Sequence, residues 1–378
     1  MPGLSEIVAS AGPPLLLAAV VAFVANIALL PLAHRFGILD HPAGRKDHAV
    51  STPTTGGIAI GLGITVAFVA LGYWHVRDLC FIAAAILLLV VGALDDRHDL
   101  RWWVRVAVQC FAVWLIYLSG VAAQHVGQLF GVTSMGLGPW QLPFTMFATV
   151  GVINAINMSD GVDGLAGGIV LATLAMFEAA ALYSGNVVLG DKLPIFIGAV
   201  VGFWLLNMRF PWQSKARVFM GNGGSALLGF VIAWSSFRLT QNDAHPVTPI
   251  LAPWLVATPL MDCVVLFARR MWHGHSPFHA DRNHLHHLML DAGFTPRQLV
   301  LTVMLVNLLL GLAASIALQM HVPQPVLVLA FVVMCLAWLA LTIRRERAVA
   351  VLAWIHGGWR GVHRGPNAPP RTMEEAEE

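Results

Sequence analysis

The chain has 378 residues, of which 57% are hydrophobic and 11% are Asp, Glu, Lys or Arg, with a formal net charge of +2. Because soluble domains carry roughly 25% of these charged residues, the composition excludes a water-soluble globule of this size. The abundance of apolar residues and the small net charge also exclude a disordered chain. Together with a mean hydropathy of +0.73, this indicates an all-α, polytopic membrane protein.

Membrane-spanning helices are expected wherever about 20 consecutive apolar residues occur, because this length crosses roughly 30 Å of hydrocarbon. Eleven segments meet this requirement. They lie near residues 13–33, 54–73, 78–94, 102–120, 142–158, 161–183, 192–208, 223–240, 248–268, 298–318 and 325–343. We therefore predict a transmembrane domain over residues 1–343, followed by a tail over 344–378 that begins as a short helix and continues as a disordered segment.

The basic residues of the connecting loops set the expected orientation, since Lys and Arg accumulate on the cytoplasmic side of membranes. Nineteen of the 22 basic residues fall on one side of the predicted spans, and the other side holds Arg77, Lys192 and Arg238. The N-terminus is therefore expected outside and the C-terminus in the cytoplasm. Most Asp, Asn and His clusters share the basic side, which no insertion rule requires, so we expect the active face to be cytoplasmic.

The first loop on the basic side carries donors that suit a phosphate group. Arg45, Lys46 and His48 lie within four positions of one another, and Gly56 and Gly57 open the next predicted helix. The first N–H groups of a helix have no partner within it, so they form a natural anion site. An ordinary basic loop followed by a helix start is the alternative.

The third predicted span ends in two adjacent carboxylates, Asp95 and Asp96, with Asp99 just beyond. Neighbouring carboxylates at a membrane surface repel each other unless a cation lies beside them. Hard oxygen ligands favour Mg²⁺ or Mn²⁺ over zinc. Asp95 and Asp96 are therefore candidate ligands of a divalent metal, with a solvated helix end as the alternative.

The connection between the fifth and sixth spans contains no Lys or Arg, yet it joins them on the basic side. Asp160 and Asp163 are spaced so that both could face one way across a helical turn, and Asn157 precedes them. Polar side chains this close to the membrane need partners, so we expect them to line a cavity. Packing between helices would explain the neighbouring glycines, but not the aspartates.

Two later segments on the basic side complete the set of candidates. Met220–Ser225 is a glycine-rich turn into a helix that could cradle phosphate or could simply pack against neighbouring helices. The last loop carries Arg282, whose guanidinium suits phosphate, followed by His284, His286 and His287.

A zinc site is disfavoured in this last loop, because on a helix His284 and His287 share a face while His286 points elsewhere. No Cys or Glu is available to complete a tetrahedral site. We therefore expect these side chains to bind phosphate or sugar hydroxyls, with metal ligation or a solvated loop as alternatives. Asp262, inside the ninth span, is either a structural hydrogen-bond partner or a cavity residue.

In this order, the five motifs resemble the polyprenyl-phosphate N-acetylhexosamine-1-phosphate transferase family. The likeness runs from about Gly37 to Gln298 and is greatest to the bacterial branch that uses undecaprenyl phosphate and UDP-GlcNAc. It implies a Mg²⁺-dependent enzyme of the bacterial inner membrane that transfers GlcNAc-1-phosphate to the lipid and releases UMP. It also implies a role in making a cell-surface polysaccharide and a possible homodimer, with no nucleic-acid partner.

The resemblance also implies roles for individual residues. Asp95 and Asp96 would lie beside the metal and the lipid phosphate, with one of them as the base. Asn157, Asp160 and Asp163 would shape the nucleotide and pyrophosphate site. The remaining candidates would hold the sugar and phosphates, with the first two at the rim of the site: Lys46, His48, Arg282, His284, His286 and His287.

One residue departs from the family pattern. Asn222 stands where the family generally has an aspartate that binds magnesium. An amide oxygen can coordinate Mg²⁺, but it carries no charge, so a lower metal affinity is expected. The chain is then a natural variant that tolerates Asn, a variant inactivated by substitution, or a divergent member with altered chemistry. A nucleotide-sugar-binding relative that Asn222 weakens in catalysis is an alternative function. A proton- or cation-coupled transporter is the alternative from another class.

Overall fold

The computed structural model describes residues 4–40, 51–130, 133–242, 244, 247–274, 276 and 283–360, and almost all of this part is helical. One two-stranded antiparallel sheet pairs β1 (Leu39–Asp40) with β2 (Thr52–Pro53). The helices are α1 (Leu4–Phe36), α2 (Gly56–Ala70), α3 (Val76–His98), α4 (Trp102–Leu118), η1 (Gly138–Trp140), α5 (Gln141–Ser159), α6 (Leu165–Ser184), α7 (Val187–Gly190), α8 (Leu193–Asn207), α9 (Gly221–Thr240), α10 (Leu251–Leu255), α11 (Ala257–Trp272), α12 (Leu285–Asp291), α13 (Pro296–Gln319), α14 (Gln324–Thr342) and α15 (Arg345–Arg360).

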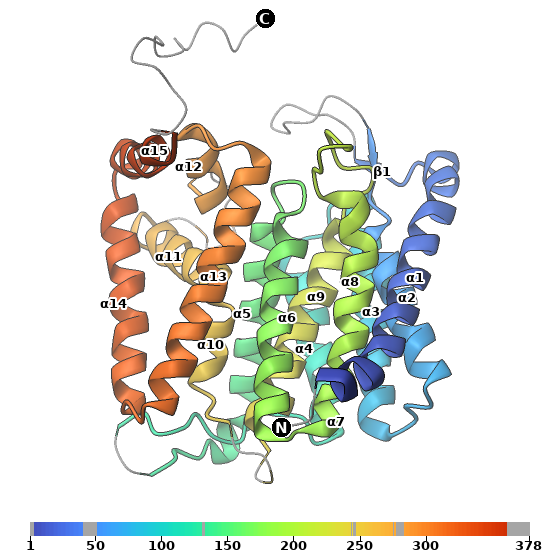
Figure 1. Cartoon of the computed structure of the whole chain (residues 1–378), viewed down its shortest axis with the longest axis horizontal. Helices are drawn as coiled ribbons and strands as arrows, with labels where there is room; N and C mark the ends of the chain where they lie inside the picture. Colours follow the sequence, from blue (N-terminus) through green and yellow to red (C-terminus); the bar gives the residue numbers. More distant parts are fainter. Residues whose placement is uncertain are drawn as a thin grey trace, which may run out of the picture.

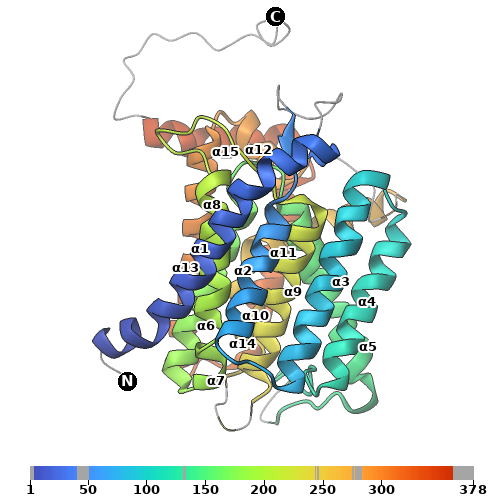
Figure 2. The ribbon, with the colours of Figure 1, turned by 90° about the vertical axis from the view of Figure 1, so that its right-hand side faces the viewer.

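Every segment predicted to span the membrane overlaps a helix in the structure, although several of these helices are shorter than predicted. Within the described residues, seven helices are long and apolar enough to cross a membrane, and α2 and α4 are apolar but shorter. The prediction of an all-α, polytopic membrane protein is therefore confirmed. Figures 1 and 2 show the long helices standing side by side, with α12, α15 and β1 at the upper end and α7 at the lower end.

The ninth predicted span is broken at Val256 into α10 and α11. Pro259 lies in the first turn of α11 and has no N–H to donate to the carbonyl of Leu255. That carbonyl instead accepts hydrogen bonds from Thr173 Oγ1 and Asn307 Nδ2, each at 3.0 Å. Neighbouring helices thus satisfy the backbone at the break, as an apolar environment requires.

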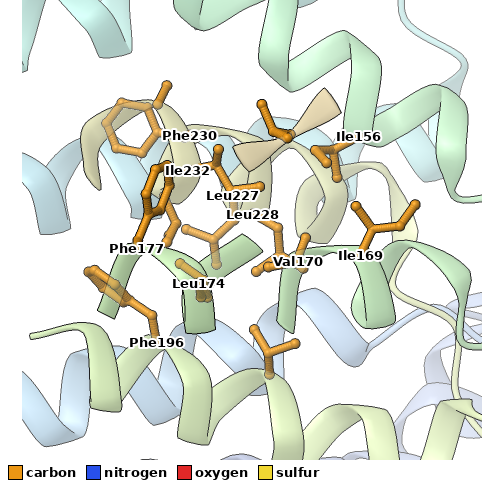
Figure 3. Packing of buried hydrophobic residues seen from close by; sticks show 14 of the residues in the cluster. Ile156, Ile169, Val170, Leu174, Phe177, Phe196, Leu227, Leu228, Phe230 and Ile232 are labelled. Carbon is orange, nitrogen blue, oxygen red and sulfur yellow. The ribbon is translucent and has the colours of Figure 1, made fainter. Parts of the chain in front are cut away.

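The core of the molecule forms around α9, which is buried along almost its whole length. Side chains of α5, α6 and α8 meet those of α9 in Figure 3, where Phe177 and Phe196 lie near Phe230 and Ile232. All four side chains are almost completely buried. Because α9 is fixed on several sides, its first turn is held in place for the site described below.

Glycines let two other helices approach the first turns of α9 closely. A Cβ at Gly92 of α3 would meet the backbone of Gly223, and one at Gly57 of α2 would meet the backbone of Gly224. Only a residue without a side chain permits such contacts between backbones. Of the two interpretations of this glycine-rich segment, helix packing therefore accounts for Gly223 and Gly224.

Buried charge at the lower end of the molecule is paired. Lys192, one of the three basic residues assigned to the sparsely charged side, is 5% exposed, and its Nζ lies 3.6 Å from Oδ1 of the buried Asp78. The same Nζ lies 4.3 Å from the centre of the Tyr73 ring. A buried charge is tolerated when an opposite charge compensates it, so this pair joins α3 to the start of α8.

Candidate active site

The candidate site residues that the structure describes lie at the upper end of the helices in Figure 1. They occupy the last turn of α3, the turn between α5 and α6, the first turn of α9, and α12. Three predicted residues, Lys46, His48 and Arg282, lie outside the described residues. The others are positioned by helices that are far apart in sequence.

Asp95 is held rigidly where α3 ends. Its side chain is buried, and its Oδ1 accepts a hydrogen bond from the Leu100 backbone N–H at 2.9 Å. Its Oδ2 forms an ion pair with Nη1 of Arg105 at 3.1 Å. The helix stops because Asp99 adopts a left-handed conformation, with φ of 48°, which turns the chain toward Arg105 on α4. Two donors from the following segment thus orient one carboxylate.

Asn222, in the first turn of α9, contacts both carboxylates. Its Nδ2 donates to Asp95 Oδ2 at 2.8 Å, and its backbone N–H lies 3.0 and 3.1 Å from the two carboxylate oxygens of Asp96. The free N–H groups and the dipole at a helix N-terminus favour negative charge there. Asp96 is exposed, unlike Asp95, so it faces the surroundings from the same position.

Asn157 adds the third helix to this cluster. Its Nδ2 donates to Oδ1 of Asn222 at 3.2 Å and to Oγ of Ser225 at 2.8 Å. The structure therefore brings together four predicted residues from α3, α5 and α9, and we call them the carboxylate–amide cluster: Asp95, Asp96, Asn157 and Asn222. The resemblance grouped Asp95, Asp96 and Asn222 as metal ligands, and the structure places them in direct contact.

The chemistry of this cluster fits a divalent cation. Carboxylate and amide oxygens are hard ligands, and Mg²⁺ usually keeps several waters or substrate oxygens in its coordination shell. In the part of the chain that the structure describes, no three His, Cys, Asp or Glu side chains are arranged to hold a metal ion. The protein would therefore supply two carboxylates, Asp95 and Asp96, with the amide of Asn222, and water or phosphate would supply the rest.

Three members of the cluster, Asp95, Asn157 and Asn222, line a groove between α3, α4, α5 and α9. The empty space in and directly above the groove is about 450 Å³, and part of this space is open to the surroundings. One part of its lining is apolar and consists of Leu88, Val91, Val108, Ile153 and Ala226. The other part is polar and consists of Asp95, Arg105, Gln109, Asn154, Asn157 and Asn222. Such a shape suits a ligand with a charged head and an apolar tail.

Asp160 and Asp163 do not share a helical face, so that expectation is wrong. They lie in the turn between α5 and α6, because α5 ends at Ser159 and α6 begins at Leu165. Oδ2 of Asp163 accepts from Arg209 Nε at 2.7 Å and from the Ala216 N–H at 3.2 Å, which fixes the loop after α8. Asp160 is half-buried, and burial, together with the carboxylates of Asp96 and Asp163, raises the pKa of Asp160 to about 7.

His284 is held by two side chains of α11. Its Nε2 lies 3.4 Å from Arg270 Nη2, and its Nδ1 lies 3.3 Å from Asp262 Oδ2. Arginine can only donate, so Nε2 of His284 accepts its hydrogen bond. Nδ1 therefore carries the ring proton and donates a hydrogen bond to Asp262. Oδ1 of Asp262 also accepts from the Leu285 N–H at 3.1 Å. Asp262 is therefore a hydrogen-bond partner that fixes the start of α12, and both nitrogens of His284 are occupied.

The three histidine rings lie together, contrary to the expectation that His286 points away. His284 precedes the helix with an extended backbone, so its ring stacks on that of His286 at 5.3 Å between centroids. The rings of His286 and His287 are 4.3 Å apart. His286 is 5% exposed and packs on Gly161, where a Cβ would meet its ring. The histidines thus adjoin the turn that carries Asp160.

The expectation of an anion site at the start of α2 is wrong. The N–H groups of Gly56 and Gly57 donate to the carbonyls of Phe219 and Met220 at 3.0 and 2.9 Å. The Phe219 N–H in turn donates to the carbonyl of Pro53 at 2.7 Å. These groups join the start of α2 to the segment before α9, so they are not available to a phosphate.

Comparisons with known proteins point to one family. The family described as glycosyl transferase family 4 matches residues 79–240. An undecaprenyl-phosphate alpha-N-acetylglucosaminyl 1-phosphate transferase of Escherichia coli O157:H7 is 34% identical over 91% of this chain and 93% of its own length. Proteins of that name from Yersinia pestis and Haemophilus influenzae are 36% and 33% identical, over 75% and 76% of this chain and 78% and 81% of their own.

The chain belongs to the family of undecaprenyl-phosphate N-acetylglucosaminyl 1-phosphate transferases. The resemblance predicted from the five motifs is thereby confirmed. The transporter interpretation is not supported, because the relatives that share most of this chain are named as transferases.

Three arginines that the sequence suggested only as basic loop residues contact the predicted site residues of this transferase. Arg105 pairs with Asp95, Arg209 pairs with Asp163, and Arg270 contacts His284. A signal existed only for Arg270, which follows Asp262 by eight residues on one helix and therefore lies on about the same face. The pair of Arg105 and Asp95 joins α4 to α3, and the pair of Arg209 and Asp163 joins two separate loops, so no spacing along the chain predicts either pair.

The transferase is expected to lose stability below pH 6.5 partly through His286. Burial, together with the electrostatic effect of the neighbouring His287 and His284 when these are protonated, lowers the pKa of His286. The folded protein therefore keeps this ring neutral while the unfolded chain binds a proton. The free energy of unfolding must therefore fall as the pH decreases through the pKa that a histidine has in the unfolded chain. The loss should reach about 1 kcal/mol at pH 5.5. The melting temperature of the parent should drop more between pH 7.0 and 5.5 than that of His286→Gln.

The control for this prediction is His98→Gln, which removes an exposed histidine at the end of α3. This variant should follow the parent. An equal drop in melting temperature for the parent and His286→Gln would show that His286 does not stay neutral in the folded protein.

Proposed function

We propose that this protein transfers GlcNAc-1-phosphate from UDP-GlcNAc to undecaprenyl phosphate and releases UMP, as the first membrane step of a cell-surface polysaccharide. The names of the relatives support this reaction. The observation that carries it is the carboxylate–amide cluster at the polar end of a groove with an apolar wall. A lipid phosphate requires both features, since its chain must remain in an apolar environment while its head reacts.

The groove between α3, α4, α5 and α9 is the proposed site of the carrier lipid. Leu88, Val91 and Val108 would contact the polyprenyl chain, and Arg105 would hold the phosphate next to Asp95. Arg105 is suited to this role because its guanidinium is half exposed and can bind phosphate through two nitrogens. The lipid phosphate would then lie beside the carboxylate–amide cluster.

A bound Mg²⁺, or Mn²⁺ in its place, would reduce the repulsion between the two anionic substrates. Asp95 and Asp96 would hold it through their carboxylate oxygens. The amide oxygen of Asn222, which accepts from Asn157 in this structure, would join them by turning toward the metal. Asn222 carries no negative charge, unlike the aspartate of the family pattern, so this site would bind the metal less tightly. The weakened relative remains the second candidate function, and the Asn222→Asp experiment below tests it.

In the proposed reaction, an oxygen of the lipid phosphate attacks the phosphorus that carries the sugar. The bond from that phosphorus to the UMP oxygen breaks, and UMP leaves with the electron pair. A phosphate monoester is already mostly ionised at neutral pH, so a strong base is not required. Asp96 is the better placed of the two carboxylates to accept a remaining proton, because Asp95 is buried and holds three donors.

The nucleotide sugar is proposed to lie between the turn after α5 and α12. Asp160 lies in that turn, His286 packs on Gly161 of the same turn, and the ring of His287 lies next to that of His286. Asp163 would act through Arg209 and the loop after α8, and His284 through the position of α12. Lys46, His48 and Arg282, outside the described residues, are proposed to bind the phosphates at the rim.

The proposed topology places eleven spans in the bacterial inner membrane, with the N-terminus outside and the site in the cytoplasm. Its support is the uneven distribution of Lys and Arg. Cysteines introduced at loops 40–50 and 275–290 should react with an impermeant thiol reagent only after the cells are opened. Labelling from outside intact cells would contradict this orientation.

The experiment that tests the activity uses purified protein, UDP-GlcNAc with a labelled sugar, and undecaprenyl phosphate, with Mg²⁺ or with EDTA. We expect label to enter the organic phase only when lipid and Mg²⁺ are both present. Folded protein that forms no lipid-linked product under these conditions would contradict the proposed function.

A further inference from the structure

The last described helix, α15, lies against the helix that carries the histidines. In Figures 1 and 2, α15 and α12 lie next to each other at the upper end of the molecule. Only two residues separate α15 from α14, so the chain turns sharply there and α15 crosses over the end of the bundle. Its side-chain hydrogen bonds go to the segment 283–298, which comprises α12, the residues beside it and the first turn of α13.

The first residue of α15 contacts both ends of α12. Arg345 donates from Nη1 to Asn283 Oδ1 at 3.3 Å and pairs through Nη2 with Asp291 Oδ2. Asn283 directly precedes His284, and Asp291 is the last residue of α12. One guanidinium group therefore connects the two ends of the seven-residue helix that carries His286 and His287.

A second set of contacts holds the other end of α15. His356 is 5% exposed, and its ring lies 4.4 Å from that of Phe294, just beyond α12. Its Nε2 donates to Oε1 of Gln298 at 3.3 Å, and Gln298 forms the capping box of α13 with Thr295. Between the two ends, Ala348 of α15 is completely buried. Helix α15 is thus fixed along the whole of segment 283–298.

These contacts matter because α12 cannot hold its own position. A helix of seven residues is too short to be stable in isolation, so its orientation depends on its neighbours. Asp262 and Arg270 fix its start, and Gly161 packs on His286. The far end at Asp291 is joined to α15 by Arg345.

We propose that α15 is a positioning element for the nucleotide sugar, and that Arg345 is its main positioning residue. Arg345 does not touch the reacting atoms; it sets the placement of His286 and His287 against the turn at Asp160. This inference rests on the proposed function, because it assigns the two histidines to the sugar-nucleotide side of the site.

The test compares Arg345→Gln with the parent by steady-state kinetics in detergent. We expect the KM for UDP-GlcNAc to rise about fivefold, the upper range for a partly exposed ion pair, while kcat and the KM for undecaprenyl phosphate stay within about twofold. Asp291→Asn should act in the same direction. The double variant Arg345→Asp with Asp291→Arg should recover most of the loss, because it restores the pair with reversed charges.

Arg347→Gln is the matched control, since it removes the same charge from an exposed position of the same helix. It should leave all three constants within about twofold of the parent. An equal rise in KM for the control, or no rise for Arg345→Gln, would overturn the proposal. A charge swap that recovers nothing would do the same, because the ion pair would not be the cause.

Hydrogen–deuterium exchange separates this proposal from the proposed function. Amides of residues 284–294 should exchange several-fold faster in Arg345→Gln than in the parent or in Arg347→Gln, whether or not the parent turns over. An inactive parent would refute the proposed function and leave this comparison decisive for the role of α15. If Arg345→Gln does not fold, Asp291→Asn carries both measurements, and unchanged exchange there would contradict the inference.

Discussion

Replacement of Asp95 by Asn is expected to lower kcat for UMP release by about a hundredfold or more at saturating Mg²⁺. The substitution keeps the size of the side chain but removes the charge that Arg105 and Asn222 contact. It would also leave Arg105 without its buried counterion, so the proposed phosphate site would lose both its metal ligand and its geometry. The measurement is UMP release by purified protein over a range of Mg²⁺ concentrations.

The matched control for this prediction is Asp99→Asn, which removes one carboxylate four residues away. Asp99 is exposed and has a positive φ, a conformation that Asn also tolerates. The control should retain turnover within about twofold of the parent. Parent-like turnover of Asp95→Asn would remove Asp95 from the mechanism, and an equal loss in both variants would point to a general effect of charge.

Replacement of Asn222 by Asp is expected to lower the Mg²⁺ concentration for half-maximal activity by about tenfold or more. Nδ2 of Asn222 lies 2.8 Å from Asp95 Oδ2, so the substitution would place a carboxylate oxygen against another carboxylate. Two unit charges at about 4 Å interact by about 4 kcal/mol at the effective dielectric of a protein surface. A divalent cation would offset the repulsion between the two carboxylates, so the variant should bind the metal more tightly than the parent.

The same variant should be less stable than the parent in EDTA and gain more stability from added Mg²⁺. Melting temperatures with and without the metal measure this difference independently of turnover. If the activity and the metal dependence of Asn222→Asp equal those of the parent, position 222 is not a metal ligand. A rise from negligible to substantial activity would instead identify the natural chain as a weakened member of its family.

The positions of Asp95, Asn157 and Asn222 were predictable from sequence because helices of membrane-spanning length bring their ends to two faces. Asp95 follows one apolar segment, Asn157 closes another, and Asn222 opens a third, so all three were expected at one end of the bundle. Their convergence into hydrogen-bonded contact confirms that expectation. The family resemblance added their grouping, which spacing alone does not provide.

Contacts between distant segments were not predictable in this way. The amides of Gly56 and Gly57 were expected to be free, because nothing near them in sequence could bond them. Their partners, Phe219 and Met220, belong to another loop. The same applies to Asp163, whose spacing from Asp160 predicted a shared helical face but whose position is fixed by Arg209.

The histidines show a further limit of sequence patterns. A helical spacing argument placed His284 and His287 on one face of a helix and His286 on another. In the structure His284 lies before the helix, and α11 occupies both of its nitrogens. Which histidine faces a ligand therefore depends on where the helix begins, and the boundary of a short helix is a matter of tertiary packing.

If the enzyme moves a phosphate together with the sugar, the fate of that phosphate distinguishes transfer of GlcNAc-1-phosphate from transfer of the sugar alone. The purified protein would be given undecaprenyl phosphate, Mg²⁺ and UDP-GlcNAc labelled both in the sugar and in the phosphate attached to it. Transfer of GlcNAc-1-phosphate predicts both labels in the lipid product at equal amounts, with unlabelled UMP released. Sugar label in the lipid with labelled UDP in solution would contradict the account, as would the absence of any lipid-linked product.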